Sequence, residues 1–177
     1  MSDNWMKAEI VGLEWARLEG RRPRKAGCNA RLGEHGDVVR TGIARLTTSD
    51  GLQGFGWSRI TPESVEGRIP FSLADALART PAGLLAVAPR FRDLEYPILD
   101  LAGRLAQRPV YALLDPEADR DGAFKVSCYD TSLYMDDLHL TDDAAAAELI
   151  ADEARAGYAA GHRAFKIKVG RGAMHMP

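Results

Sequence analysis

The sequence has little of what marks secreted or membrane-spanning proteins. Its two cysteines, Cys28 and Cys128, are too few for a disulfide framework, so we expect both to be free thiols. No apolar run approaches the roughly 20 residues that a membrane-spanning helix needs. The first residues also lack the basic-then-apolar pattern of a secretion signal. These absences predict a cytoplasmic protein without a membrane partner.

An excess of charge of either sign is also missing. The 23 basic and 25 acidic residues are mixed along the chain and give a formal net charge of -2. No broad positive field therefore favours nucleic acid. The 46% hydrophobic content is enough for one good core, and the length of 177 residues suggests one or two domains. A small molecule is the expected partner.

The front of the chain has the pattern of an antiparallel sheet. Apolar residues alternate with polar ones in three segments, which predicts strands over residues 8–18, 38–47 and 52–57. The sequence Ser49-Asp50-Gly51 predicts a tight turn between the last two strands. Residues 21–33 combine charge and turn-forming residues without periodicity, which predicts a long mobile loop between the first two.

From residue 72 onward, the apolar residues have the spacing of helices. Leu73, Ala76 and Leu77 share one face of a helix that we expect to begin at Ser72. A second helical pattern has apolar residues at positions 91, 94, 98, 101 and 105, and Pro97 is expected to kink or start that helix. A polar link over residues 117–122 then has the composition of a domain boundary, which predicts domains over residues 1–122 and 123–177.

The second domain has the order of one βαβ unit, with a strand over residues 124–129, a helix over 142–160 and a strand over 163–169. Thr141 is expected to cap the helix, and Gly161 suits the left-handed position after it. Such a unit implies parallel strands joined by a right-handed crossover.

A pair of lysines marks the last of these strands. Phe165, Ile167 and Val169 point to one face of the strand, while Lys166 and Lys168 point to the other. The lysines lie toward the carboxyl end, where α/β barrels place their active sites. Mutual repulsion and partial burial would favour the loss of a proton from one of them, giving an amine able to act as a general base. The same spacing also fits the solvated face of an exposed strand, so spacing alone leaves both interpretations open.

The motifs around the lysines resemble a known family. Tyr129-Asp-Thr-Ser132, a crossover helix and then Gly161-His-Arg-Ala-Phe-Lys-Ile-Lys-Val-Gly170 resemble the first barrel strands of mandelate racemase and its relatives in the enolase superfamily, which include muconate-lactonizing enzymes and acid-sugar dehydratases. Asp50-Gly51, Gly54-Phe-Gly56 and residues 96–111 resemble that superfamily's capping domain. The resemblance spans nearly the whole chain. It implies an α+β capping domain, with an antiparallel sheet and helices, followed by the start of a TIM-like (β/α) barrel.

The resemblance also implies a mechanism. Lys168 would be the base that removes a proton alpha to a substrate carboxylate, while Lys166 would help to bind the carboxylate and favour the neutral form of its neighbour. Thr131 falls where mandelate racemase has a substrate-contacting serine. The family stabilises the resulting enediolate on Mg²⁺, which offsets the charge on the carboxylate oxygens. We therefore expect a small carboxylate or sugar-acid substrate and a dehydratase (a lyase), a racemase or a cycloisomerase (both isomerases).

Two loops of the capping domain are expected to close over the substrate, at residues 17–35 and 49–62. Arg24 is a candidate for attracting an anionic substrate, although a short basic run is more often a solvated loop. Trp57 is a candidate wall of the pocket, although a tryptophan in a hairpin is more often part of the core. Both alternatives stay open.

The barrel part of the chain is short, since residues 125–177 stand where a complete barrel takes about 250 residues. By resemblance, the metal ligands are acidic residues of the next three strands, and no Asp or Glu follows Glu153. We therefore expect a chain truncated after the second barrel strand, without a metal site of its own and inactive by itself. The alternative is a non-catalytic product that acts only in association, because an unfinished barrel exposes sheet edges and apolar surface.

Two further expectations concern partners. We expect the enzyme to be a homo-oligomer. A nucleic-acid-binding module built on Arg163, Lys166, Lys168 and Arg171 does not fit the net charge or the apolar setting of the lysines.

Overall fold

The computed structural model describes residues 3–29, 33–115, 125–134 and 137–169. The chain divides into two compact units, one formed by Met1–Glu19 and Arg40–Gly122 and the other by Gly20–Val39 and Ala123–Pro177. The domain division predicted at residue 122 stays a prediction.

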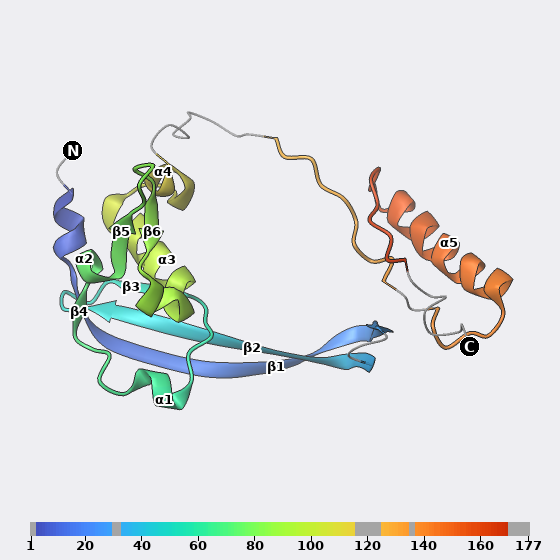
Figure 1. The fold of residues 1–177 in the computed structure, drawn as a ribbon, viewed down its shortest axis with the longest axis horizontal. Helices are drawn as coiled ribbons and strands as arrows, with labels where there is room; N and C mark the ends of the chain where they lie inside the picture. Colours follow the sequence, from blue (N-terminus) through green and yellow to red (C-terminus); the bar gives the residue numbers. More distant parts are fainter. Residues whose placement is uncertain (1–2, 30–32, 116–124, 135–136, 170–177) are drawn as a thin grey trace. The chain divides into compact units, whose positions relative to one another are not determined.

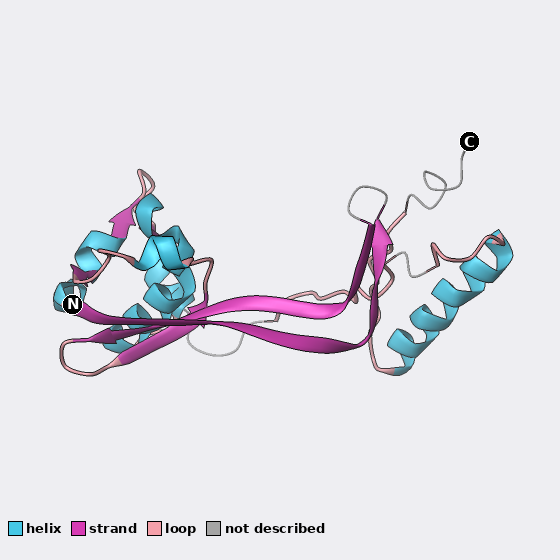
Figure 2. Ribbon diagram, turned by 90° about the horizontal axis from the view of Figure 1, so that it is seen from below, coloured by secondary structure: helices cyan, strands magenta, loops and turns pink. Residues whose placement is uncertain are grey.

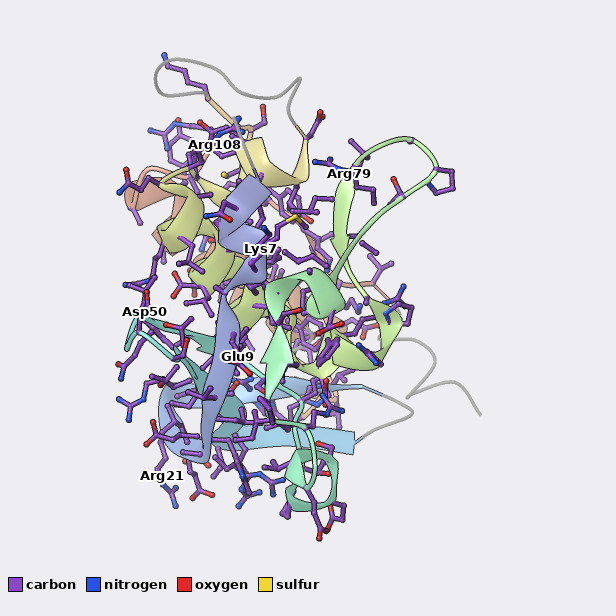
Figure 3. All side chains as sticks on the ribbon, turned by 90° about the vertical axis from the view of Figure 1, so that its left-hand side faces the viewer. Lys7, Glu9, Arg21, Asp50, Arg79 and Arg108 are labelled. Atoms are coloured by element: carbon purple, nitrogen blue, oxygen red, sulfur yellow. The ribbon has the colours of Figure 1, made fainter. Side chains whose placement is uncertain are left out.

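A four-stranded sheet in the order β3-β2-β1-β4 forms the front of the chain (Figure 1). Its strands are β1 (Glu9–Asn29), β2 (Gly33–Thr48), β3 (Gln53–Trp57) and β4 (Phe71–Ser72). Strand β3 pairs antiparallel with β2, with Ala44 opposite Gly56, and β4 pairs antiparallel with the start of β1. The predicted hairpin between β2 and β3 is confirmed. Its turn contains Asp50, which is labelled in Figure 3. The Thr48 hydroxyl donates a hydrogen bond to Asp50, which holds the pKa of that carboxyl below its ordinary value.

The prediction of a loop over residues 21–33 is wrong for most of this range, because residues 21–29 belong to strand β1. Strand β1 continues through this region as far as Asn29, and β2 begins at Gly33, so the two form a long ribbon (Figure 2). Two neighbouring strands satisfy each other's backbone groups whatever their side chains are. Charged side chains add ion pairs along the ribbon, with partners at 2.6–2.8 Å: Arg21–Asp37, Arg40–Glu19 and Arg45–Glu14. Apolar alternation is therefore not needed for these strands to form.

The main helix α3 (Glu95–Ala106) is accompanied by shorter elements before and after it in the chain. They are η1 (Asp3–Lys7), α1 (Pro62–Val65), α2 (Leu73–Ala76), β5 (Leu77–Arg79), β6 (Leu85–Val87), η2 (Pro89–Leu94) and α4 (Val110–Leu114). The helix predicted from Ser72 exists for one turn only. It begins with a reciprocal cap between Ser72 and Asp75, and Leu77 instead opens a strand that pairs with Val87. Leu73, Ala76 and Leu77 are all buried, so the spacing of apolar residues alone does not reveal where the helix ends.

Helix α3 is the later part of the predicted helix and carries its buried residues at positions 98 and 101, whereas positions 91 and 94 lie in the 3-10 helix η2 before it. Pro97 lies in the first turn of α3, as expected for a proline that starts a helix. The helix packs on one face of β3 at very short range. A Cβ atom on Gly54 would lie 2.6 Å from the Cβ of Leu101, and one on Gly56 would lie 2.6 Å from the Cβ of Tyr96. The glycine-aromatic-glycine sequence therefore allows the helix and the strand to approach each other, and its Phe55 points to the opposite, exposed face.

In the second unit, the predicted crossover helix is confirmed as α5 (Asp143–Ala159). Its cap is Asp142, whose carboxylate accepts hydrogen bonds from the N–H groups of Ala144 and Ala145, so the assignment of the cap to Thr141 is wrong. Aspartate can accept from two orphan amides at once, which a single hydroxyl does less well. Gly161 has a φ of +105°, a conformation that favours glycine, as predicted. None of the helices in the described ranges combines the length and apolar character that crossing a bilayer requires.

Candidate active site

The lysine-bearing segment after α5 pairs in parallel with the segment before it. The Asp130 N–H donates to the carbonyl of Ala164 at 2.9 Å, and the Lys166 N–H donates to the carbonyl of Asp130 at 2.8 Å. These two bonds form a parallel bridge between Asp130 and Phe165. The predicted parallel pairing is thus present, but only at one bridge: residues 125–129 and 163–169 are extended segments rather than regular strands.

The expectation that the lysines are partly buried is wrong for the described residues. The side chains of Lys166 and Lys168 are exposed, and so are the apolar residues expected on the other face, Ile167 and Val169. A parallel strand is buried when it has neighbouring strands and layers on both faces. In the described part of the chain, this segment has one hydrogen-bonded neighbour, residues 130–133. The exposure of both faces follows from that.

Both the backbone and the side chain of Lys168 contact the segment that precedes α5. Its backbone N–H donates to the carbonyl of Leu133 at 2.9 Å, and its Nζ lies 5.1 Å from the centre of the Tyr134 ring. The Tyr134 ring is in turn 5.7 Å from the ring of His35, with the ring planes tilted by 49°. These residues come from three separate parts of the second unit, because His35 lies on β2. The lysine, the phenol ring and the imidazole form one cluster.

Asp130 adds a carboxylate beside the lysine segment. Its Oδ1 accepts a hydrogen bond from the backbone N–H of Ser132 at 2.8 Å, which holds the pKa of the carboxyl below its ordinary value. Desolvation opposes this shift, while the Ser132 hydroxyl and the charge of His162 add to it. Helix α5 approaches closely here, since a Cβ on Gly157 would lie 2.5 Å from Asp130 Oδ2. Asp130 is therefore an ionised, half-buried group at the start of the pair of segments.

The structure brings together some of the predicted site residues. Thr131, exposed, directly follows the bridge residue Asp130, so it lies in the same stretch of chain as the carbonyl that binds the Lys166 N–H. Arg24 lies on β1, but its side chain is outside the described part of the structure. Trp57 belongs to the first unit. Only Thr131, Lys166 and Lys168 are thus placed as neighbours.

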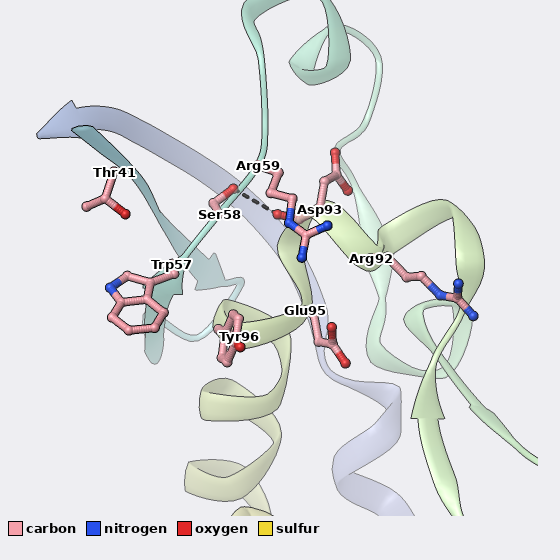
Figure 4. A pocket seen from close by; sticks show the side chains of 8 residues that line it. All are labelled: Thr41, Trp57, Ser58, Arg59, Arg92, Asp93, Glu95 and Tyr96. Atoms are coloured by element: carbon pink, nitrogen blue, oxygen red, sulfur yellow. Dashed lines mark hydrogen bonds between the residues drawn. The ribbon is translucent and has the colours of Figure 1, made fainter. Parts of the chain in front are cut away.

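Trp57 lines a hollow at the end of β3, and its side chain is 64% exposed (Figure 4). Its ring meets that of Tyr96 edge-on, with centres 5.9 Å apart. The hollow has a volume of about 230 Å³. Beyond the two rings it is polar, and there the hydroxyl of Ser58 donates to the backbone carbonyl of Asp93 at 2.9 Å. The alternative that Trp57 is a core residue is therefore wrong, and whether it contacts a substrate stays a prediction.

A metal ion in a protein is held by carboxylate, imidazole or thiolate side chains that converge on one point. Among the described residues, no group of three His, Cys, Asp or Glu side chains is arranged so that it could hold one. Asp130 already accepts a hydrogen bond from Ser132. The described residues therefore do not fit a metal site, and no chemical step of this chain can be derived through a metal.

Known structures resemble the chain, whereas no family model matches it and no curated protein does. A mandelate racemase/muconate lactonizing protein from Geobacillus sp. Y412MC10, solved with magnesium and tartrate, is 44% identical over 97% of this chain, with a TM-score of 0.80. The chain is thus similar, over nearly its whole length, to the mandelate racemase/muconate lactonizing enzyme family of the enolase superfamily, which agrees with the resemblance seen in its motifs.

Two further similar structures are solved forms of galacturonate dehydratase from Geobacillus sp., both 44% identical over 97% of this chain. One contains D-galacturonate and 5-keto-4-deoxy-D-galacturonate and has a TM-score of 0.77. The other is a mutant with Mg and has a TM-score of 0.76. The chain spans 43–44% of the length of these structures. The combination of an antiparallel capping domain with the start of a barrel agrees with the predicted fold class.

Residues that the sequence patterns did not single out also lie beside the lysine segment. Asp130 lies within the motif that carries the resemblance, but nothing in the spacing indicated its hydrogen bond to Ser132. Tyr134 follows the same motif closely, which is a signal of position though not of role. His35 had no signal, because the ribbon that carries it was predicted to be a loop.

Proposed function

We propose that this chain supplies the capping domain and the lysine-bearing segment of a Mg²⁺-dependent enzyme that removes a proton alpha to the carboxylate of a sugar acid. Dehydration is the favoured reaction, with racemisation as the second possibility within the same chemistry. The observation that carries the proposal is the 44% identity, over 97% of the chain, to a galacturonate dehydratase solved with D-galacturonate and 5-keto-4-deoxy-D-galacturonate.

The two molecules in that relative define a reaction. The carbon alpha to the carboxylate of D-galacturonate is C5. Loss of the C5 hydrogen and of the C4 hydroxyl as water leaves an enol, and its ketone has a carbonyl at C5 and no hydroxyl at C4, which is the second molecule named. A base for C5 and a group that binds the carboxylate are therefore the minimum requirement.

We assign these roles as the resemblance implies. Lys168 is the base, Lys166 binds the substrate carboxylate through its positive charge, and Thr131 contacts the substrate from the neighbouring segment. The exposure of the two lysine side chains supports their availability to a substrate. Arg24 and Trp57 are secondary candidates for contacts from the capping domain. Mg²⁺ would supply charge stabilisation of the carboxylate oxygens, with ligands outside the described residues.

A chimera tests the assignment. These 177 residues replace the corresponding part of the Geobacillus galacturonate dehydratase, and the purified chimera is incubated with D-galacturonate and Mg²⁺ in deuterated water. We expect formation of 5-keto-4-deoxy-D-galacturonate, followed by NMR. Lys168→Ala should abolish both product formation and exchange of the C5 hydrogen, and Lys166→Ala should mainly raise KM.

Lys125→Ala is the matched control, because Lys125 is an exposed lysine of the same unit outside the proposed site. It should leave the rates unchanged. Circular dichroism and thermal melting establish that each variant is folded. Unchanged C5 exchange in a folded Lys168→Ala chimera would sink the assignment of the base.

One observation favours a second role for the 177-residue chain by itself. Val126, Tyr129, Ile167 and Val169 are apolar residues on the two extended segments, and each is more than half exposed. Such surface favours association. Light scattering distinguishes the cases: a defined oligomer supports a role in assembly and the expected homo-oligomer, whereas a monomer or a broad aggregate does not. Calorimetry with Mg²⁺ on the same sample tests the expectation that this chain alone does not bind the metal tightly and is inactive.

A further inference from the structure

The two lysines of the proposed site differ in how firmly they are held. Both have a backbone N–H bonded to the preceding segment, Lys166 to Asp130 and Lys168 to Leu133. Among the described residues, Lys168 alone of the two has a side-chain contact as well, to the face of the Tyr134 ring at 5.1 Å. Leu133, which accepts the backbone bond, is 4% exposed and so is a fixed anchor.

Tyr134 is well placed to restrict the Lys168 side chain. A cation within about 6 Å of a ring centre is attracted by the negative face of the ring. A free lysine side chain has much rotamer freedom, and the combination of a backbone bond to Leu133 with a ring contact to the next residue removes part of it. The ammonium group is thereby kept near the carboxyl end of the lysine segment.

The ring of His35 also contacts the Tyr134 ring. The rings of His35 and Tyr134 have centres 5.7 Å apart at a tilt of 49°, which lies within the range of favourable aromatic pairs. Both rings are half-buried. Because His35 lies on β2, the long ribbon contacts the lysine segment through Tyr134.

We propose that Tyr134 is a positioning residue for Lys168, and that His35 fixes the Tyr134 ring from the β1–β2 ribbon. The proposal rests on the proposed function in one respect, namely that Lys168 is the base. A base must hold its nitrogen close to the C–H bond that it breaks, and small displacements are costly. The contact uses the ring face and not the hydroxyl, so phenylalanine should replace tyrosine at this position.

The contact is measurable in the 177-residue chain without a substrate. The sequence has five lysines, and labelling their ε-carbons with ¹³C resolves five ε-methylene signals. Protons over the face of an aromatic ring are shifted upfield, so the Lys168 signal should lie upfield of that of Lys125. A nuclear Overhauser effect between the Lys168 ε-protons and the Tyr134 ring protons is expected as well.

Variants separate the ring contact from folding in general. Tyr134→Leu should remove the upfield shift, Tyr134→Phe should keep it, and His35→Ala should reduce it. Tyr158→Leu is the control, because the Tyr158 ring contacts a different cation of the same unit, Arg163 at 4.0 Å. Its loss should leave the Lys168 signal in place. If Tyr134→Leu does not fold, the Overhauser effect in the unmodified chain decides by itself, and its absence overturns the proposal.

Kinetics of the chimera test the consequence for the reaction. Tyr134→Leu should lower kcat about 10- to 100-fold with little change in KM, while Tyr134→Phe restores most of the rate. A folded Tyr134→Leu chimera with unchanged kcat would overturn the positioning role. The two proposals fail differently: a Lys168→Ala chimera that still exchanges C5 hydrogen removes the base assignment, whereas a missing Overhauser effect with an inactive Lys168→Ala chimera removes only the role of Tyr134.

Discussion

The backbone N–H of Ser132 donates a hydrogen bond to Asp130 Oδ1 at 2.8 Å, two residues earlier in the chain. This local turn has a charged acceptor, so the ionised form of Asp130 is favoured over the neutral form. The backbone of the same residue forms the parallel bridge to Phe165, so Asp130 contributes both a charged side chain and a pairing backbone beside the lysine segment.

We therefore predict that Asp130 titrates below its ordinary pKa of 3.8. A depressed pKa in the folded chain contributes stability above pH 3.8, and this contribution is lost as the pH falls through the lower, folded value. The ¹³C signal of the Asp130 carboxyl reports the titration, with Asp130→Asn to assign it. Ser132→Ala should retain most of the shift, because the backbone N–H is its largest cause. A midpoint at or above 3.8 would contradict the interpretation.

Helix α5 depends on a glycine where it crosses the bridge. A Cβ atom on Gly157 would lie 2.5 Å from Asp130 Oδ2 and 2.8 Å from Cε1 of Phe165. We predict that Gly157→Ala destabilises the second unit, because overpacking costs about 1–3 kcal/mol and outweighs the gain of about 1 kcal/mol in helix propensity. Hydrogen exchange of the α5 amides measures the effect.

The control for Gly157 is Gly20→Ala, since a Cβ at that position has nothing within 4 Å. Its effect should stay within about 0.5 kcal/mol. The smaller, non-aromatic side chain in the double variant Gly157→Ala/Phe165→Leu should recover part of the loss, because it removes the ring atom that a Cβ at position 157 would meet. If Gly157→Ala instead slows exchange in α5, the close approach of the helix is not limiting.

The sequence predicts α5 well because its signals are local. A run of good helix formers ends at Gly161. Its φ of +105° is a conformation that only glycine adopts readily. The cap was misplaced by one residue, since Thr141 and Asp142 are both good caps and the choice depends on which side chain reaches the amides. The hairpin turn at Asp50-Gly51 was predicted for the same local reason.

Non-local features could not be predicted in this way. The ribbon beyond Glu19 is held by pairing with β2, which leaves no periodic trace in a charged sequence. The exposure of Lys166 and Lys168 depends on which segments lie beside them, not on their own spacing. The contact of His35 with Tyr134 joins residues almost 100 positions apart, and a pattern confined to one segment contains no information about it.

Because α3 packs closely on β3, we predict that adding one methyl group to β3 lowers the stability of the first unit strongly. A Cβ on Gly54 would lie 2.6–2.8 Å from Leu101 Cβ, N and Cα, and the last two are backbone atoms of α3 that cannot rotate away. Gly54→Ala should therefore destabilise the first unit by about 3 kcal/mol, the upper end for overpacking. Urea unfolding followed by circular dichroism measures this. Gln53→Ala, at the exposed neighbouring position, should change stability by less than about 0.5 kcal/mol, and equal effects of the two would contradict the packing argument.

The last prediction concerns the stability that ion pairs add to the β1–β2 ribbon. Arg40 Nε lies 2.7 Å from Glu19 Oε2 across β1 and β2, and both side chains are more than half exposed. Exposed pairs of this kind contribute about 0.2–1 kcal/mol and are screened by salt. A double-mutant cycle with Arg40→Ala and Glu19→Ala should give a coupling energy in that range at low salt and near zero at 1 M salt. The backbone pairing does not depend on this charge pair, so amide protection along the ribbon should persist at 1 M salt. Loss of that protection would mean that ion pairs, rather than strand pairing, hold the segment that the sequence pattern assigned to a loop.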